Sequence, residues 1–109
     1  MAEAAKVLGQ VAPSATTLTT LYTVPGATST VVSSLSVCNR GSTSTTLRIS
    51  IQIAAAADDP KQYIYYDLVI NGNDTFVATI GITLATTDVV KCYAGNANLS
   101  FSLFGIEVT

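Results

Sequence analysis

Histidine and tryptophan are absent from this sequence of 109 residues, and charged residues are scarce. Histidine is the commonest general base and a frequent zinc ligand, so its absence argues against most acid–base catalysis and against zinc chemistry. The chain also lacks a glycine-rich phosphate loop, a catalytic pair of carboxylates and a Ser-His-Asp set. We therefore expect a protein that is not an enzyme and that uses no cofactor and no metal.

Clusters of basic charge and long apolar runs are missing as well. The five basic residues are scattered along a chain of net charge −2, so there is no electrostatic footprint for nucleic acid. The longest apolar run covers residues 53–57, far below the roughly 20 residues that cross a bilayer. No secretory signal is recognisable, because Glu3 precedes a lone Lys6 and no apolar core follows. We expect no nucleic-acid partner, no membrane partner and synthesis in a cytoplasm.

Threonine and serine take the place of charge. Hydrophobic residues make up 49% of the chain and charged residues 11%, against about 25% charged in typical soluble domains. Runs of Ser and Thr occupy residues 16–17, 19–20, 28–30 and 42–46. Uncharged polar faces suit β-structure and contact partners at little desolvation cost. The composition favours an all-β protein that other proteins bind.

The clearest secondary-structure signal is residues 47–53, where four aliphatic residues alternate with polar ones. This is the period-2 pattern of a strand with one buried face. β-branched and aromatic residues between turn signals predict six more strands. They cover residues 17–24, 29–38, 62–70, 75–84, 88–94 and 98–108. Since the connections are too short for crossover helices, we predict an antiparallel β-sandwich, jelly-roll or immunoglobulin-like, of about seven to eight strands.

Three finer predictions concern faces and turns. In the second strand, alternation places Val31, Leu35 and Val37 on one face. Asn71-Gly72 is the strongest hairpin signal in the chain. At Gly105, either a bulge turns the following apolar residues inward or the alternation continues unbroken.

Residues 1–15 are predicted to be an N-terminal arm, followed by a single sandwich domain over residues 16–109. The arm begins with mild helical preference, but Gly9, Pro13 and Ser14 interrupt it before a stable helix can form. We expect the arm to be either disordered or extended along a neighbour.

Two cysteines, Cys38 and Cys92, fall in the second and sixth predicted strands. These positions face each other in many sandwiches, so a disulfide is geometrically feasible. The missing secretory signal, the missing tryptophan and the ease with which lone cysteines serve as small core residues favour free thiols.

Acidic and amide residues cluster at Asp58-Asp59 and at Asn71, Asn73 and Asp74. Their oxygens are of the kind that calcium prefers, but neither cluster has the spacing of a calcium loop. We interpret both as polar turns.

Three tyrosines, Tyr63, Tyr65 and Tyr66, stand within four residues. Alternation places Tyr63 and Tyr65 on one face of a strand and Tyr66 on the other, so one set is expected in the core and one exposed. Exposed tyrosines serve as interface anchors or as a carbohydrate platform. We take Tyr63 and Tyr65 as candidate partner contacts and keep a carbohydrate-binding module as an alternative function.

Several segments, in their order and spacing, resemble small all-β virion structural proteins of tailed bacteriophages. The likeness extends over residues 8–109. It is carried by residues 21–25 (LYTVP), 37–41 (VCNRG), 65–67 (YYD), 73–75 (NDT), 81–84 (GITL) and 99–105 (LSFSLFG).

The resemblance implies a capsid decoration (cement) protein on the virion surface, made in the host cytoplasm and bound to the major capsid protein. It also implies a homo-oligomer, with a trimer favoured, and an arm laid across a neighbour through residues such as Lys6, Val7 and Leu8. A tail, collar or fibre structural protein is the alternative within the same class.

Overall fold

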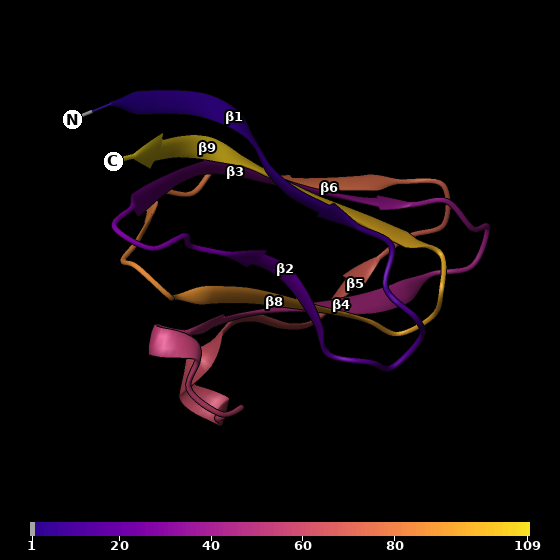
Figure 1. Cartoon of the computed structure of the whole chain (residues 1–109). Coiled ribbons are helices and arrows are strands. Elements are labelled where there is room, and N and C mark those ends of the chain that lie inside the picture. The colour runs from indigo at the N-terminus through magenta and orange to yellow at the C-terminus, as the bar shows by residue number, and fades with distance from the viewer. Residues whose placement is uncertain (1) are drawn as a thin grey trace.

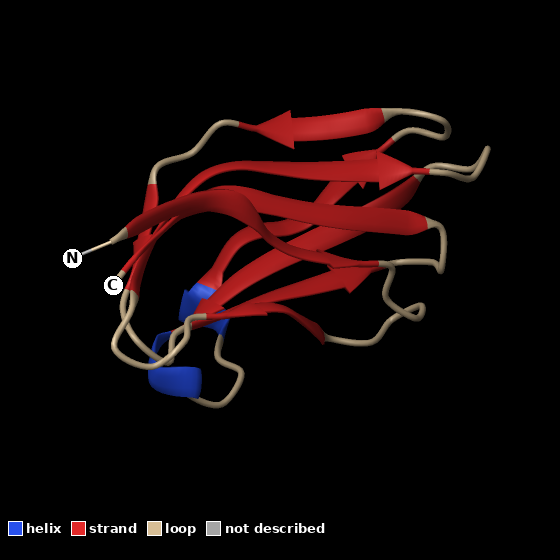
Figure 2. Cartoon of the chain, turned by 45° about the horizontal axis from the view of Figure 1, so that its top comes forward, coloured by secondary structure: helices blue, strands red, loops and turns tan. Residues whose placement is uncertain are grey.

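The computed structural model describes residues 2–109, which form a sandwich of two antiparallel sheets (Figures 1 and 2). The strands among these residues are β1 (Glu3–Val11), β2 (Thr19–Thr23), β3 (Ser29–Asn39), β4 (Thr45–Gln52), β5 (Tyr63–Ile70), β6 (Thr75–Ala78), β7 (Ile82–Leu84), β8 (Val89–Ala94) and β9 (Leu99–Val108). The five-stranded sheet has the order β1-β9-β3-β6, with β7 also paired to β3, and the four-stranded sheet has the order β2-β8-β4-β5. The predicted all-β antiparallel sandwich is confirmed.

Two single-turn 3-10 helices, η1 (Ile53–Ala55) and η2 (Pro60–Gln62), lie in the connection from β4 to β5. Figure 2 shows them together at one end of the sandwich. Asp59 caps η2 by accepting a hydrogen bond from the backbone N–H of Lys61, and Gln62 completes a capping box. No helix among residues 2–109 is long and apolar enough to span a membrane.

The core lies between the two sheets and is built from the inward face of each strand. Its largest fully buried apolar side chains are Phe101, Leu35, Leu47, Ile49, Leu84, Leu99, Val24, Val32, Val37 and Val90. The alternation predicted in residues 47–53 is confirmed at its start, since Leu47 and Ile49 are buried. It fails at its end, because β4 stops at Gln52 and Ile53 is 72% exposed in η1.

The structure has nine strands among residues 2–109, two more than the seven segments predicted from the sequence. Residues 75–84 divide into β6 and β7, which pair with successive stretches of β3. The second additional strand is β1, which pairs with β9 from Glu3 opposite Val108 to Val11 opposite Phe101.

The prediction of an arm at residues 1–15 is therefore wrong for residues 3–11. Their strand is created by long-range pairing with β9, which local helical preference cannot reveal. Gly9, interpreted from the sequence as a breaker, lies inside β1, where a Cβ atom would stand 2.1 Å from the carbonyl oxygen of Leu21. The glycine allows β1 to pass close to β2.

A register shift between Val32 and Ser34 changes which side of β3 is buried. Val32, Leu35 and Val37 face the core, whereas Val31 is 42% exposed, so the prediction that Val31 shares a face with Leu35 and Val37 is wrong. A bulge reverses the side-chain alternation at the point where it occurs.

In β9 the alternation continues unbroken through Gly105. Gly105 and Glu107 are buried and Ile106 is partly exposed, so no bulge turns the end of β9 inward. A Cβ atom at Gly105 would lie 2.2 Å from the carbonyl oxygen of Val31. The glycine therefore serves close strand packing.

The turn at Asn71-Gly72 does not close a hairpin. It carries the chain from β5 in the four-stranded sheet to β6 in the five-stranded sheet. The buried amide of Asn39 holds this crossing, because its Nδ2 donates to the carbonyls of Thr43 (3.0 Å), Ile70 (3.4 Å) and Asn71 (3.2 Å). The hairpin prediction is wrong because turn chemistry specifies a reversal and not the partner of the next strand.

Candidate functional site

The three candidate contacts in β1 have different surroundings. The Nζ atom of Lys6 lies 2.8 Å from Oε1 of Glu107, in an ion pair at the end of β9. Leu8 packs against the core, at the register shift between Val7 and Gly9. Val7 is 49% exposed, so it alone of the three presents an open apolar surface.

Val7 belongs to a larger apolar surface on the outside of the five-stranded sheet. Ile106 of β9 stands opposite Val31 of β3 on one side and Ala5 of β1 on the other. We call Val7, Val31 and Ile106 the apolar strip; their exposures are 49%, 42% and 37%. The strip crosses three hydrogen-bonded strands at the end of the sandwich where the two termini lie together (Figure 1).

Beneath this end of the sheet, a polar cluster joins four strands around the buried carboxyl of Glu107. The Tyr22 hydroxyl donates to Oε2 of Glu107 at 2.6 Å and lies 2.8 Å from Oγ1 of Thr30. Contacts with Lys6 and then Tyr22 hold the pKa of Glu107 below its usual range. Burial, together with the bond to Glu107, raises the pKa of Tyr22 to about 12.

The tyrosines of β5 are not arranged as the alternation predicts. Ile49 of β4 stands opposite Tyr65 and the next residue, Ser50, stands opposite Tyr63, so β5 has one extra residue between the two tyrosines. Tyr65 consequently packs against the core, edge-on to Phe76, with ring centroids 5.3 Å apart. The bulge separates Tyr63 from Tyr65, so the prediction that they share a face is wrong.

Tyr63 instead meets Tyr66, the tyrosine assigned to the opposite face. Their rings lie perpendicular with centroids 5.1 Å apart. Tyr66 is 60% exposed, and Tyr63 is partly buried and donates its hydroxyl to Oδ1 of Asp58 at 2.9 Å. Burial and then this hydrogen bond raise the pKa of Tyr63.

Arg48 organises the outer face of the four-stranded sheet beside these rings. Its guanidinium carbon lies 4.2 Å from the ring centroid of Tyr66 and 4.3 Å from that of Tyr93, which is its cross-strand neighbour. Its Nε donates to Oδ1 of Asp67 at 2.6 Å and its Nη2 to Oδ2 at 3.3 Å. This two-point bond fixes the plane of the guanidinium.

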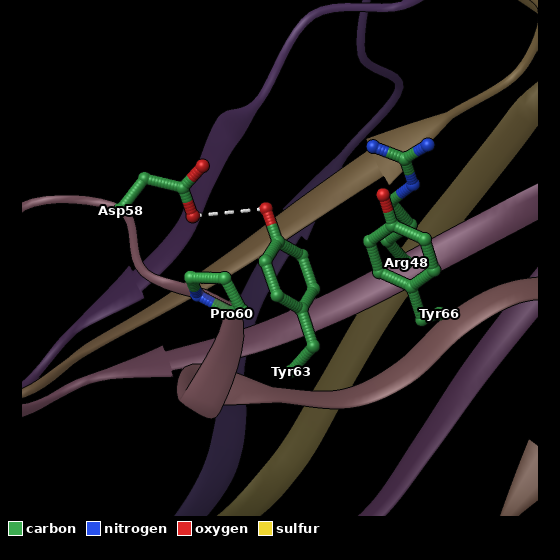
Figure 3. Close-up of a pocket in the computed structure, with 5 residues that line it drawn as sticks. All are labelled: Arg48, Asp58, Pro60, Tyr63 and Tyr66. Carbon is green, nitrogen blue, oxygen red and sulfur yellow. Dashed lines mark hydrogen bonds between the residues drawn. The ribbon is translucent and has the colours of Figure 1, made fainter.

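A pocket of about 470 Å³ opens next to this stack, lined by Arg48, Asp58, Pro60, Tyr63 and Tyr66 (Figure 3). Its walls come from β4, β5 and the segment that contains η2. Of these residues, Tyr63 is a contact predicted from the sequence, whereas Arg48 and Tyr66 are not. The outward position of Arg48 in the alternation of residues 47–53 was the one available signal.

Cys38 and Cys92 are free thiols in opposite sheets. Cys92 faces the core and is fully buried, whereas Cys38 is on the outer side of β3, where its neighbours Val37 and Asn39 face inward. A disulfide would need both side chains on inward faces, so the structure does not support the bridge. Burial raises the pKa of the Cys92 thiol to about 12, which makes it a poor nucleophile.

Three aspartates of the loops are engaged in local structure. Asp59 caps η2, Asp74 accepts from the N–H of Thr75, and Asp88 accepts from the N–H groups of Ala54 and Ala85. Among residues 2–109, no three His, Cys, Asp or Glu side chains are grouped so that they could hold a metal ion.

Comparison of the chain with protein-family models, with curated proteins and with solved structures finds no match.

Proposed function

We propose that this chain is a non-enzymatic structural protein of a tailed-phage virion, a capsid decoration protein that binds the major capsid protein and stabilises the shell. The apolar strip is the observation that carries the proposal. Val7, Val31 and Ile106 lie exposed on neighbouring strands of a protein that has little surface charge to desolvate. The choice of the major capsid protein as the partner rests on the resemblance of several sequence segments to virion proteins of this type.

The position of the apolar strip at a sheet edge adds to its suitability for binding. β1 is the last strand of the five-stranded sheet, and an edge strand offers backbone N–H and C=O groups to an added strand. A segment of the major capsid protein could pair with β1 and place apolar side chains over Val7 and Ile106. The strip supplies apolar burial and the edge supplies directional hydrogen bonds.

Cryo-electron microscopy of the virion tests the proposed position. We expect on the order of hundreds of copies on the shell, bound through the five-stranded sheet. About six to twelve copies at the tail would instead show that the chain is a tail, collar or fibre protein and would reject the decoration role. The proposal includes a homo-oligomer, with a trimer favoured, which native mass measurement of the purified protein tests separately.

Matched surface variants test the apolar strip itself. Val7→Glu and Ile106→Glu should each reduce the amount of protein that sediments with particles lacking it. Val77→Glu is the control, since Val77 is 61% exposed in β6, on the opposite edge of the same sheet. Unchanged attachment of both strip variants would reject the strip as the binding surface.

A further inference from the structure

The pocket beside Arg48 lies on the outer face of the four-stranded sheet, whereas the apolar strip lies on the five-stranded sheet. The two features are therefore on opposite layers of the sandwich. The volume of about 470 Å³ is within the range of ordinary small-ligand sites, roughly 300–1,000 Å³. Binding at the strip leaves this pocket accessible.

The Tyr66 ring is held in place by neighbouring side chains but remains exposed. Arg48 covers one face of the ring at 4.2 Å and is itself fixed by Asp67 and backed by Tyr93. Tyr66 also contacts the ring of Tyr63, with centroids 5.1 Å apart, yet it remains 60% exposed, so a large part of the ring beside the pocket is accessible to a ligand (Figure 3). A ring that is already ordered loses little conformational entropy when a ligand stacks on it.

Hydrogen-bonding capacity surrounds this open ring. Asp58 uses Oδ1 to accept from Tyr63, and within residues 2–109 its Oδ2 has no hydrogen-bond partner. The Tyr66 hydroxyl and the Nη1 group of Arg48 are likewise without a partner among the described residues. The pocket thus combines an aromatic ring with unpaired acceptor and donor groups among the residues that line it.

The charged side chains around the pocket indicate which class of ligand it favours. Asp67 neutralises Arg48, and Asp58 adds a further negative charge, so an anionic ligand would meet net repulsion. A cationic ligand would place a second positive charge on a ring whose other face already contacts Arg48. A neutral ligand with one apolar face and several hydroxyl groups satisfies both the ring and the polar rim.

We propose that this pocket is a saccharide-binding site. The C–H face of a neutral sugar ring stacks on Tyr66, because the negative face of an aromatic ring attracts weakly positive C–H groups. The sugar hydroxyls bond to Asp58 Oδ2, with Tyr63 positioning Asp58. This proposal does not depend on the virion function, since it rests on a different sheet.

Glycan-array binding by the full chain, followed by NMR titration with the arrayed sugars that bind, tests the site. We expect saturable binding that shifts the amide signals of residues 58–67. Tyr66→Ala should weaken binding at least tenfold, Tyr66→Phe should retain most of it, and Asp58→Asn should weaken it without removing a ring. Val69→Ala is the control, because Val69 is 64% exposed on the same strand and does not line the pocket.

Three outcomes would overturn the proposal. They are an array on which the wild type binds no glycan, sugar binding that Tyr66→Ala and Asp58→Asn leave unchanged, and tighter binding of tetramethylammonium than of any arrayed sugar. Asp58→Asn keeps the test decisive if Tyr66→Ala disturbs β5, because Asp58 lies in an exposed loop.

Discussion

The hydroxyl of Tyr22 donates a 2.6 Å hydrogen bond to the carboxylate of Glu107, which also pairs with Lys6. This contact connects the two layers, because Tyr22 belongs to β2 of the four-stranded sheet and Glu107 to β9 of the five-stranded sheet. Through Lys6 it also holds β1, the edge strand that contributes Val7 to the apolar strip. The stability of this polar cluster should therefore affect the proposed binding surface.

Acid should weaken the fold through Glu107. The folded pKa of Glu107 is lowered from the ordinary value of 4.5, so its stabilising effect is complete above pH 4.5 and is lost as the pH falls through the lower, folded pKa. Urea unfolding as a function of pH measures this loss. Glu107→Gln should be less stable at neutral pH by about 1–3 kcal/mol and should lack that part of the acid dependence. Parallel pH curves for the two proteins would contradict the assignment.

Alkali should act through Tyr22 with the opposite sign. Its folded pKa is raised from 10.0 to about 12, so its contribution is present below pH 10 and is lost as the pH rises toward about 12. Tyr22→Phe removes the titrating hydroxyl, so the stability difference between wild type and variant should shrink over that interval. At neutral pH the variant should be destabilised by about 1–3 kcal/mol, because Glu107 loses a buried donor. A constant difference at all pH values would show that Tyr22 does not titrate as proposed.

Two glycines should respond in opposite ways to the same substitution. Gly105→Ala places a Cβ atom 2.2 Å from the Val31 carbonyl oxygen and should destabilise the fold by about 1–3 kcal/mol as β3 and β9 separate. Gly26→Ala meets nothing within 4 Å and has no positive φ, so it should be neutral or stabilising by about 0.4–1 kcal/mol. Thermal or urea unfolding measures both. Equal effects would mean that β9 accommodates the methyl group.

The two thiols should differ in reactivity. Iodoacetamide should label Cys38 in the native protein and reach Cys92 only after unfolding, because Cys92 is fully buried and burial raises its pKa to about 12. Mass spectrometry counts the labels, and Cys38→Ser should remove the native one. A mass two hydrogens lower under non-reducing conditions would instead reveal a disulfide and contradict the free-thiol arrangement.

The sequence alone specified the fold class, since scarce charge, abundant threonine and the alternation at Leu47 and Ile49 all favour half-buried strands. Six of the predicted segments each correspond to one strand, and the seventh, residues 75–84, contains both β6 and β7. The absence of histidine likewise argued from composition alone against most acid–base catalysis.

The tertiary structure decided what depends on pairing between distant residues. β1 is a strand only because β9 lies beside it, and the side of the sheet that each side chain occupies depends on bulges. One extra residue opposite Ile49 and Ser50 parts Tyr63 from Tyr65 and brings Tyr63 to Tyr66, and one shift after Val32 leaves Val31 exposed. A single inserted residue reverses a period-2 pattern, and nothing in the local sequence marks its position. The apolar strip and the pocket both result from such shifts. The local sequence therefore predicted the sandwich, whereas long-range strand pairing decided which residues lie on its surfaces.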